Sequence, residues 1–295
     1  MSVHSQSKLV AVEESHRFMF DCFKAVHVPD DHARAMADLL IAADHRGHFS
    51  HGMNRLEMYL NDLAINSTNA SAVPEIINET PATAWVDGKN GLGAVVGNYC
   101  MDLAIKKAKI VGVGWVCAKR SNHYGIAGWY SKRAMEHGMV GISMTNTSPA
   151  MAPTRSKEAA LGTNPLAFGA PAKKDKFLLD MATTSVAMGK IEIQRRKGDS
   201  LPDGWAQDPE GKQTNDAELA YKTRCLMPLG GLELTIIENQ KTDPLKPVLV
   251  PGDKEDAIME AVNQSGGIQY LENQLKCCEE LSKRLNVKPM EFIMK

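Results

Sequence analysis

The sequence of 295 residues has no long apolar run. No stretch approaches the roughly 20 consecutive apolar residues that a membrane-spanning helix needs, so we expect no membrane partner. Residues 1–5 show no charged start followed by an apolar segment, so we expect no secretory signal. The six cysteines are scattered and form no CxxC pair. These features predict a cytoplasmic protein whose thiols stay reduced.

Charge of one sign is not in excess either. The sequence has 34 basic and 35 acidic residues, giving a formal net charge of −1. This balance offers no electrostatic footprint for nucleic acid or for an anionic membrane. With 43% hydrophobic and 23% charged residues, the composition is that of a globular protein with one large domain or two ordinary ones. We therefore expect a small molecule or another protein chain as the partner, and no nucleic acid.

The segment 43–55 is the richest in side chains that can bind or transfer protons, with three histidines and two arginines between two helical patterns. Arg55 follows His51 by four residues, so in a helix both would lie on one face. A histidine can transfer a proton near neutral pH, and an arginine can hold a carboxylate through two parallel hydrogen bonds. From spacing alone, a solvated polar loop with one capping histidine is an open alternative.

The three histidines of this segment also raise the question of a metal site. His45, His48 and His51 recur at intervals of three, as metal ligands on one helix could. However, Gly47 and Gly52 interrupt the helical pattern, and no cysteine or paired carboxylate stands at ligand spacing. We expect no metal site here.

The rest of the chain alternates short strands with helices, which predicts an α/β fold. The apolar patterns predict helices over residues 10–25, 30–44, 53–64, 95–108, 127–137, 186–193, 253–263 and 268–285. They predict strands over residues 84–86, 111–116, 139–144 and an apolar strand that ends near Asp180. A polar stretch before Pro74 marks a boundary after the first helical unit.

Gly91, Gly93 and Gly97 resemble a dinucleotide-binding fingerprint. Their last spacing is one residue too long, and no acidic residue closes a second strand about 20 positions later. We expect a helix start packed closely on a sheet rather than a Rossmann phosphate loop.

Three further segments hold polar groups where strands end. Residues 121–128 follow a predicted strand and precede a helix, the place where α/β proteins put ligand-binding groups. The turn 162–165 offers Thr163 and Asn164 as hydrogen-bonding groups. Asp180 ends an apolar strand and needs a partner if buried, such as a histidine. Capping of the following helix is the open alternative for Asp180 and for the polar residues of 121–128.

These segments together resemble the malate/L-lactate (L-sulfolactate) dehydrogenase family over residues of about 10 to 230. The motifs that carry the resemblance occur in the family's order: Ser50-His51-Gly52-x-x-Arg55, Ser121-Asn122-His123-x-Gly125, Gly162-Thr163-Asn164-Pro165, Asp180-Met181-Ala182 and Gly189-Lys190-Ile191. Members are NAD(P)-dependent oxidoreductases of 2-oxo or 2-imino acids and are typically homodimers. The resemblance implies a non-Rossmann cofactor domain with a mixed sheet over residues 76–244. It also implies a helical domain built from residues 1–75 and 245–295.

The resemblance also implies roles for individual residues in the interconversion of a small 2-hydroxy acid and a 2-oxo acid. His51 would be the proton donor or acceptor, and Arg55 would hold the substrate carboxylate. Asp180 would fix the tautomer of His51 and raise its pKa. NAD is the expected cofactor, with NADP possible. Its expected binding residues are His123, Tyr124, Gly125, Gly162, Thr163, Asn164, Pro165, Asp180, Met181, Ala182 and Thr183.

The sequence departs from the family after Gly231. The family continues with a Lys-Gly-Tyr-Gly-like turn and a long helix, whereas this chain has residues 232–240 and resembles the family again near 246–252. We therefore expect an internal deletion that leaves the α/β domain incomplete. The alternative to an active enzyme is a catalytically impaired chain that acts as a non-catalytic dimer partner.

Overall fold

The two ends of the chain form helices that share one core. The computed structural model describes residues 7–153, 156–173, 176–229 and 251–293. The N-terminal helices are α1 (Val12–Ala25), α2 (Asp30–His45), the short η1 (Met53–Arg55) and α3 (Leu56–Ala64). In α1, Phe18, Met19, Cys22 and Phe23 recur at helical spacing and are fully buried.

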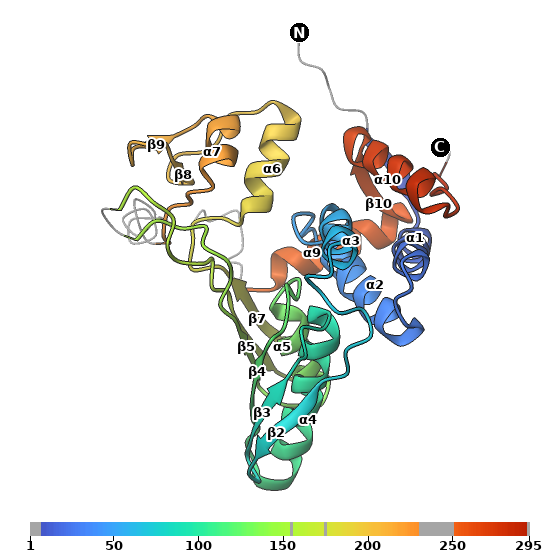
Figure 1. Cartoon of the computed structure of the whole chain (residues 1–295), viewed down its shortest axis with the longest axis vertical. Helices are drawn as coiled ribbons and strands as arrows, with labels where there is room; N and C mark the ends of the chain where they lie inside the picture. Colours follow the sequence, from blue (N-terminus) through green and yellow to red (C-terminus); the bar gives the residue numbers. More distant parts are fainter. Residues whose placement is uncertain (1–6, 154–155, 174–175, 230–250, 294–295) are drawn as a thin grey trace.

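The C-terminal segment returns to these helices. It consists of α9 (Asp253–Ser265), β10 (Ile268–Leu271) and α10 (Glu272–Leu285). Leu275 and Leu281 of α10 belong to the same hydrophobic cluster as Phe18 of α1 and Leu40 of α2, and α10 lies beside α1 in Figure 1. The described C-terminal helices thus pack on the N-terminal ones.

One helix predicted over 268–285 begins later than expected. Residues Ile268–Leu271 form a strand that pairs antiparallel with β1 (Ser7–Val10). Ile268 and Tyr270 alternate with exposed Gln269, and both apolar side chains are fully buried. This alternation of period two suits a strand, and the partner strand lies at the other end of the chain.

The middle of the chain forms the α/β part with a mixed sheet. Strands β2 (Glu75–Glu79) and β3 (Thr83–Asp87) pair antiparallel, whereas β3 and β4 (Trp115–Lys119) pair parallel. Helix α4 (Gly93–Val111) connects β3 to β4. It runs further than predicted and stops at Gly112, whose φ of +88° favours glycine, so the predicted strand 111–116 starts only at Trp115.

A second sheet lies next along the chain. Strands β5 (Gly141–Met144), β6 (Leu166–Pro171) and β7 (Lys176–Met181) are antiparallel neighbours, and α5 (Gly128–Met135) contacts all three. The sequence predicted a turn over 162–165 and no strand over the residues that follow it. The pairing of β6 on both sides explains why a strand forms there instead.

A smaller cluster surrounds α6 (Met188–Lys197). It includes α7 (Ala217–Thr223) and the short strands β8 (Ala206–Gln207) and β9 (Gln213–Thr214), with Ile191 fully buried in its centre. In Figure 1, α6 and α7 lie on the opposite side of the molecule from α1 and α10.

The start of α4 shows why Gly93 is a glycine. A Cβ at Gly93 would lie 2.1 Å from the carbonyl oxygen of His123. The helix start therefore packs closely, as predicted, but against the loop that carries His123 rather than against the sheet alone. Gly91, Gly93 and Gly97 contact protein atoms of Gly88, Ala72, His123 and Tyr130, which accounts for their small size.

A buried carboxylate anchors the link between α2 and η1. Asp44 is fully buried, and its Oδ2 accepts hydrogen bonds from Met53 N at 2.8 Å and from the Tyr270 hydroxyl at 2.8 Å. A Cβ at Gly52 would lie 1.9 Å from Asp44 Oδ1, so only glycine fits there. Asp44 thus ties residues 46–52 to α2 and, through Tyr270, to β10.

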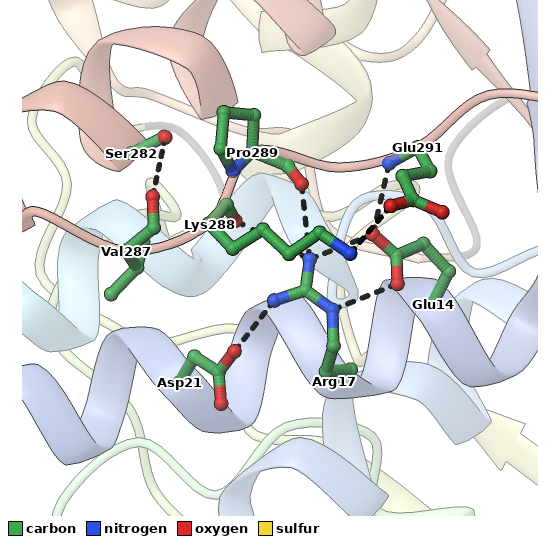
Figure 2. A network of polar contacts seen from close by, with 8 residues as sticks. All are labelled: Glu14, Arg17, Asp21, Ser282, Val287, Lys288, Pro289 and Glu291. Atoms are coloured by element: carbon green, nitrogen blue, oxygen red, sulfur yellow. Dashed lines mark hydrogen bonds and ion pairs between the residues drawn. The ribbon is translucent and has the colours of Figure 1, made fainter.

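A polar network holds the C-terminal segment on α1 (Figure 2). Arg17 Nη2 donates to Glu14 Oε1 at 2.7 Å, and Nη1 donates to Asp21 at 2.5 Å. The same guanidinium donates to the carbonyl of Pro289 at 3.1 Å, while Glu291 N donates to Glu14 at 2.9 Å. Because several charge-assisted bonds converge on one partly buried group, we expect it to contribute more than an isolated surface ion pair.

Arg17→Ala should therefore lower the free energy of unfolding by about 1–2 kcal/mol, because both the carboxylates and the carbonyls of Lys288 and Pro289 lose their donor. Lys132→Ala, which removes an exposed pair with Glu136, is the matched control and should cost less than about 0.5 kcal/mol. Urea unfolding measures both. Hydrogen exchange at Ile293 N, which bonds Leu9 O at 2.9 Å, should accelerate only in the Arg17 variant. Equal effects of the two substitutions would contradict this role.

Burial raises the pKa of the Asp44 carboxyl to about 7, against about 3.9 for aspartate in an unfolded chain. Between these pH values the folded protein holds a proton that the unfolded chain has released. This contribution to stability is complete below about pH 4 and is lost as the pH rises through about 7.

Asp44→Asn should remove that pH dependence, which is on the order of 1–3 kcal/mol between about pH 5 and pH 8. The difference in unfolding free energy between the wild type and the variant should shrink steadily as the pH rises. Asp199→Asn, at an exposed aspartate, is the control and should show a constant difference. A constant difference for Asp44→Asn as well would show that Asp44 does not titrate in this range.

Candidate active site

A cavity of about 1070 Å³ lies where loops from the two sheets and the α2–η1 link meet. The lining comes from the end of β4 and the loop after it (118–127) and from residues 145–149, which follow β5. It also comes from the end of β7 and the loop after it (180–187, without Thr183). The carboxyl ends of strands are the usual ligand-binding edge of α/β sheets. Typical pockets for drug-sized ligands hold about 300–1000 Å³, so this cavity has room for an extended cofactor together with a small acid.

His51 enters the cavity from the segment that Asp44 anchors. Its Nδ1 lies 2.8 Å from the Ser50 hydroxyl, and its ring stacks on His123 with 5.7 Å between ring centroids. Burial, followed by the charges of His123 and Arg55, holds the pKa of His51 well below its ordinary value. His51 is therefore a neutral imidazole at pH 7, and its Nε2 has no hydrogen-bond partner among the described residues.

The expected effect of Asp180 on His51 is wrong. Asp180 was expected to fix the tautomer of His51 and to raise its pKa, and it does neither through a direct bond. Both residues line the cavity, but Asp180 Oδ2 accepts a hydrogen bond from Gly128 N at 2.7 Å, at the start of α5. No hydrogen bond joins Asp180 to His51 among the described residues, and the pKa of His51 is lowered, not raised. The backbone of α5, which the sequence did not place near Asp180, supplies the partner that this carboxylate needs.

His123 is held by a residue that the sequence analysis missed. Its Nδ1 lies 2.6 Å from the Tyr59 hydroxyl and accepts from Gly125 N at 3.3 Å. An Nδ1 that accepts leaves the proton of the neutral imidazole on Nε2. Burial, and then the charge of Arg55, lowers the pKa of His123 to about 4. The spacing of Tyr59 could have indicated its place near the site, because it follows Arg55 by four residues and lies on the same helical face.

Arg55 was expected to hold the substrate carboxylate, but its side chain is bonded to other groups of the protein. Its Nε donates to the Ser50 carbonyl at 2.8 Å, and its Nη2 pairs with Glu192 of α6 at 3.2 Å. The side chain is largely buried and does not line the cavity. The reason is the docking of α6, where a Cβ at Gly189 would lie 2.5 Å from the Ser50 Cβ.

The predicted cofactor residues divide into those that line the cavity and those that build its walls. The lining includes His123, Tyr124, Gly125, Thr163, Pro165, Asp180, Met181 and Ala182. Gly162, Asn164 and Thr183 are not part of the lining. Asn164 Oδ1 accepts from Thr147 N at 3.0 Å, and the Thr183 hydroxyl donates to the Thr163 carbonyl at 2.9 Å.

The three histidines of the 43–55 segment have separate partners. His45 Nε2 lies 2.8 Å from Asn263 Oδ1, His48 Nε2 lies 3.7 Å from Glu255, and His51 contacts Ser50. In the described part of the chain, no group of three or more His, Cys, Asp or Glu side chains could hold a metal ion. The same residues include no helix that is long and apolar enough to span a membrane.

The sequence analysis assigned no role to several residues that line the cavity. Residues 145–149 contribute hydroxyl and amide groups, Lys190 contributes an ammonium group, and Glu255 reaches the cavity from α9. Glu255 lies beyond residues 230–250, which are outside the described residues, as is the predicted break after Gly231. No local pattern marks Glu255, because α9 looks like an ordinary capped helix.

Comparison with known proteins places this geometry in a family. The family model described as malate/L-lactate dehydrogenase matches residues 10–234. A malate dehydrogenase of Pyrococcus horikoshii is 50% identical over 204 residues, which cover 69% of this chain and 57% of that protein. An L-sulfolactate dehydrogenase of Methanocaldococcus jannaschii is 47% identical over 219 residues, covering 74% of this chain and 63% of that protein. The chain thus matches less than two thirds of the length of these relatives.

Solved structures agree with the sequence matches. The sulfolactate dehydrogenase of Methanocaldococcus jannaschii has a TM-score of 0.83 at 33% identity, over 97% of this chain and 100% of that one. The malate dehydrogenase of Pyrococcus horikoshii OT3 has a TM-score of 0.85 at 31% identity, over 96% and 97%. The matched fold, the ordered motifs and the family model lead to one conclusion. The chain belongs to the malate/L-lactate dehydrogenase family.

Proposed function

We propose that this protein is an NAD(P)-dependent oxidoreductase that interconverts a small 2-hydroxy acid and the corresponding 2-oxo acid. The observation that carries the proposal is the placement of His51 and His123, ring against ring, in a cavity at the carboxyl ends of β4, β5 and β7. Family membership supports the reaction class, since relatives are named malate and L-sulfolactate dehydrogenases.

The residues around the cavity fit a dinucleotide cofactor. Hydroxyl and amide groups of Ser121, Asn122, Thr145, Thr147 and Ser148 lie along the lining and can bond ribose and phosphate oxygens. We propose NAD as the cofactor, with NADP possible. A ureidoglycolate dehydrogenase of Escherichia coli is named with NAD(+), and a sulfolactate dehydrogenase of Chromohalobacter salexigens with NADP(+).

In the proposed reaction, a bound nicotinamide supplies or accepts the hydride at the substrate's second carbon. His51 handles the proton at the adjacent oxygen through its free Nε2. The lowered pKa favours the neutral imidazole, which is the form that accepts a proton during oxidation of the hydroxy acid. In the reverse direction, the negative charge of a bound acid stabilises the imidazolium that donates the proton. Tyr59 and His123 hold the neighbouring ring in place.

Arg55 and Asp180 complete the proposed catalytic group. We assign the substrate carboxylate to Arg55, which would exchange its partner Glu192 for the substrate, as one carboxylate can replace another at a guanidinium. Asp180 would act from the cavity lining as a cofactor-binding residue, held in place by the hydrogen bond that it accepts from Gly128 N. The eight lining residues named above would contact the cofactor.

We also propose the larger organisation that the resemblance implies. A helical domain of residues 1–75 and 245–295 would pack on a non-Rossmann cofactor domain of residues 76–244. A homodimer would cover part of the sheet surface, where Trp85 and Trp115 are 47% and 49% exposed. A non-catalytic dimer partner is not favoured, because the cavity retains lining residues from both sides of 230–250.

The test is turnover of a panel of 2-oxo acids, followed by the absorbance of NADH or NADPH. The wild type should consume at least one, and His51→Asn should lower kcat by about 10²–10⁴-fold because the proton donor is lost. His45→Asn, in the same segment but bonded to Asn263, is the control and should retain activity. Circular dichroism of both variants verifies the fold. A His51→Asn protein with wild-type turnover would reject the assigned role.

A further inference from the structure

Among the described residues, the cavity lining contains one ammonium group with no hydrogen bond, ion pair or ring contact. Of its basic side chains, Arg120 Nε bonds Asp87 Oδ1 at 2.8 Å and Lys119 Nζ lies 4.8 Å from the centre of the Trp85 ring. Lys190 also lines the cavity, but its side chain has no hydrogen bond or ion pair among the described residues. A free charge beside a ligand cavity is available to a ligand of opposite sign.

The backbone at Lys190 is fixed relative to His51. The first turns of α6 are docked on the His51 segment on both sides of Lys190. Gly189 packs against the Ser50 side chain, and Glu192 pairs with Arg55 at 3.2 Å. One turn further on, Arg196 Nη1 donates to Asn54 Oδ1 at 2.6 Å. Lys190 therefore lines the cavity from a helix whose position relative to His51 is fixed by these contacts.

The acidic groups of the lining have other contacts. Asp180 bonds the backbone of Gly128, and Glu255 lies 3.7 Å from His48. Neither forms an ion pair with Lys190 within the described structure. The charge of Lys190 lowers the pKa of both His48 and His51, and for His51 it does so less than the charge of Arg55. The charge of Lys190 thus reaches His51, as that of Arg55 does, but it has a smaller effect on the pKa of His51.

We propose that Lys190 binds a second anionic group of the substrate, at the end far from the reacting carbon. This inference rests on the proposed function of the site. The carboxylate next to the reacting carbon belongs beside His51, and Arg55 lies four residues further along the chain. A second carboxylate or sulfonate would reach Lys190 on α6. The substrate class would then be 2-hydroxy and 2-oxo acids with two anionic groups, in preference to those with one.

Binding of L-malate and L-lactate to the NADH-saturated protein tests the proposal by calorimetry. The two acids differ by a single carboxylate, and neither reacts with reduced cofactor. Lys190→Gln should weaken L-malate binding by about 10–100-fold, the range expected for one charge-assisted hydrogen bond, and change L-lactate binding by less than about 3-fold. Lys190→Arg should retain most of the preference for L-malate, because it keeps the charge.

Lys197→Gln is the matched control, at the exposed far end of the same helix, and should change neither affinity. An equal loss for both acids in Lys190→Gln would show that Lys190 holds the shared carboxylate and would overturn the proposal. Unchanged binding of both acids, or a wild type without preference for L-malate, would overturn it as well. Turnover of 2-oxo acids by the wild type is measured separately, so a failed proposed function is distinguishable from a wrong assignment of Lys190.

Discussion

The carboxylate of Asp44 is the contact on which the site depends. It joins the end of α2, the backbone of Met53 and the hydroxyl of Tyr270 in a place with no access to water. Tyr270 belongs to β10, so the C-terminal segment helps to fix the loop that carries His51. A buried carboxyl is costly unless it is bonded or protonated. Here two hydrogen bonds stabilise the carboxylate, and burial raises its pKa to about 7, so that it is protonated at lower pH. The geometry of His51 therefore follows from the return of the chain's end to its beginning.

The docking of α6 on the segment that carries His51 is the second constraint on the site. It decides which positively charged side chains face the cavity. The pairing of Glu192 with Arg55 removes one guanidinium from the cavity, while the same helix brings Lys190 into it. The two sides of the cavity are thus coupled through a single helix. This coupling also explains why Gly189 has to be small, since a side chain there would separate α6 from Ser50.

Local patterns in the sequence predicted much of this arrangement. The motifs around His51, His123 and Asp180 do meet in one cavity, because each lies in a segment that follows a helix or strand. The sequence could not predict the partner of Arg55, since Glu192 is 137 residues away, or the β1–β10 pairing, which joins the two ends of the chain. It also gave Asp180 the wrong partner. Hydrogen bonds to backbone groups, such as Gly128 N, leave no mark in a side-chain pattern.

The proposed function requires the cavity to bind a nicotinamide cofactor, although the chain matches less than two thirds of its relatives' length. The most direct measurement is a titration of the purified protein with NADH and NADPH, followed by nicotinamide fluorescence on excitation of tryptophan. We expect saturable binding of at least one of them, with one site per chain, to a sample that unfolds cooperatively. A cooperatively folded protein that binds neither cofactor would contradict it.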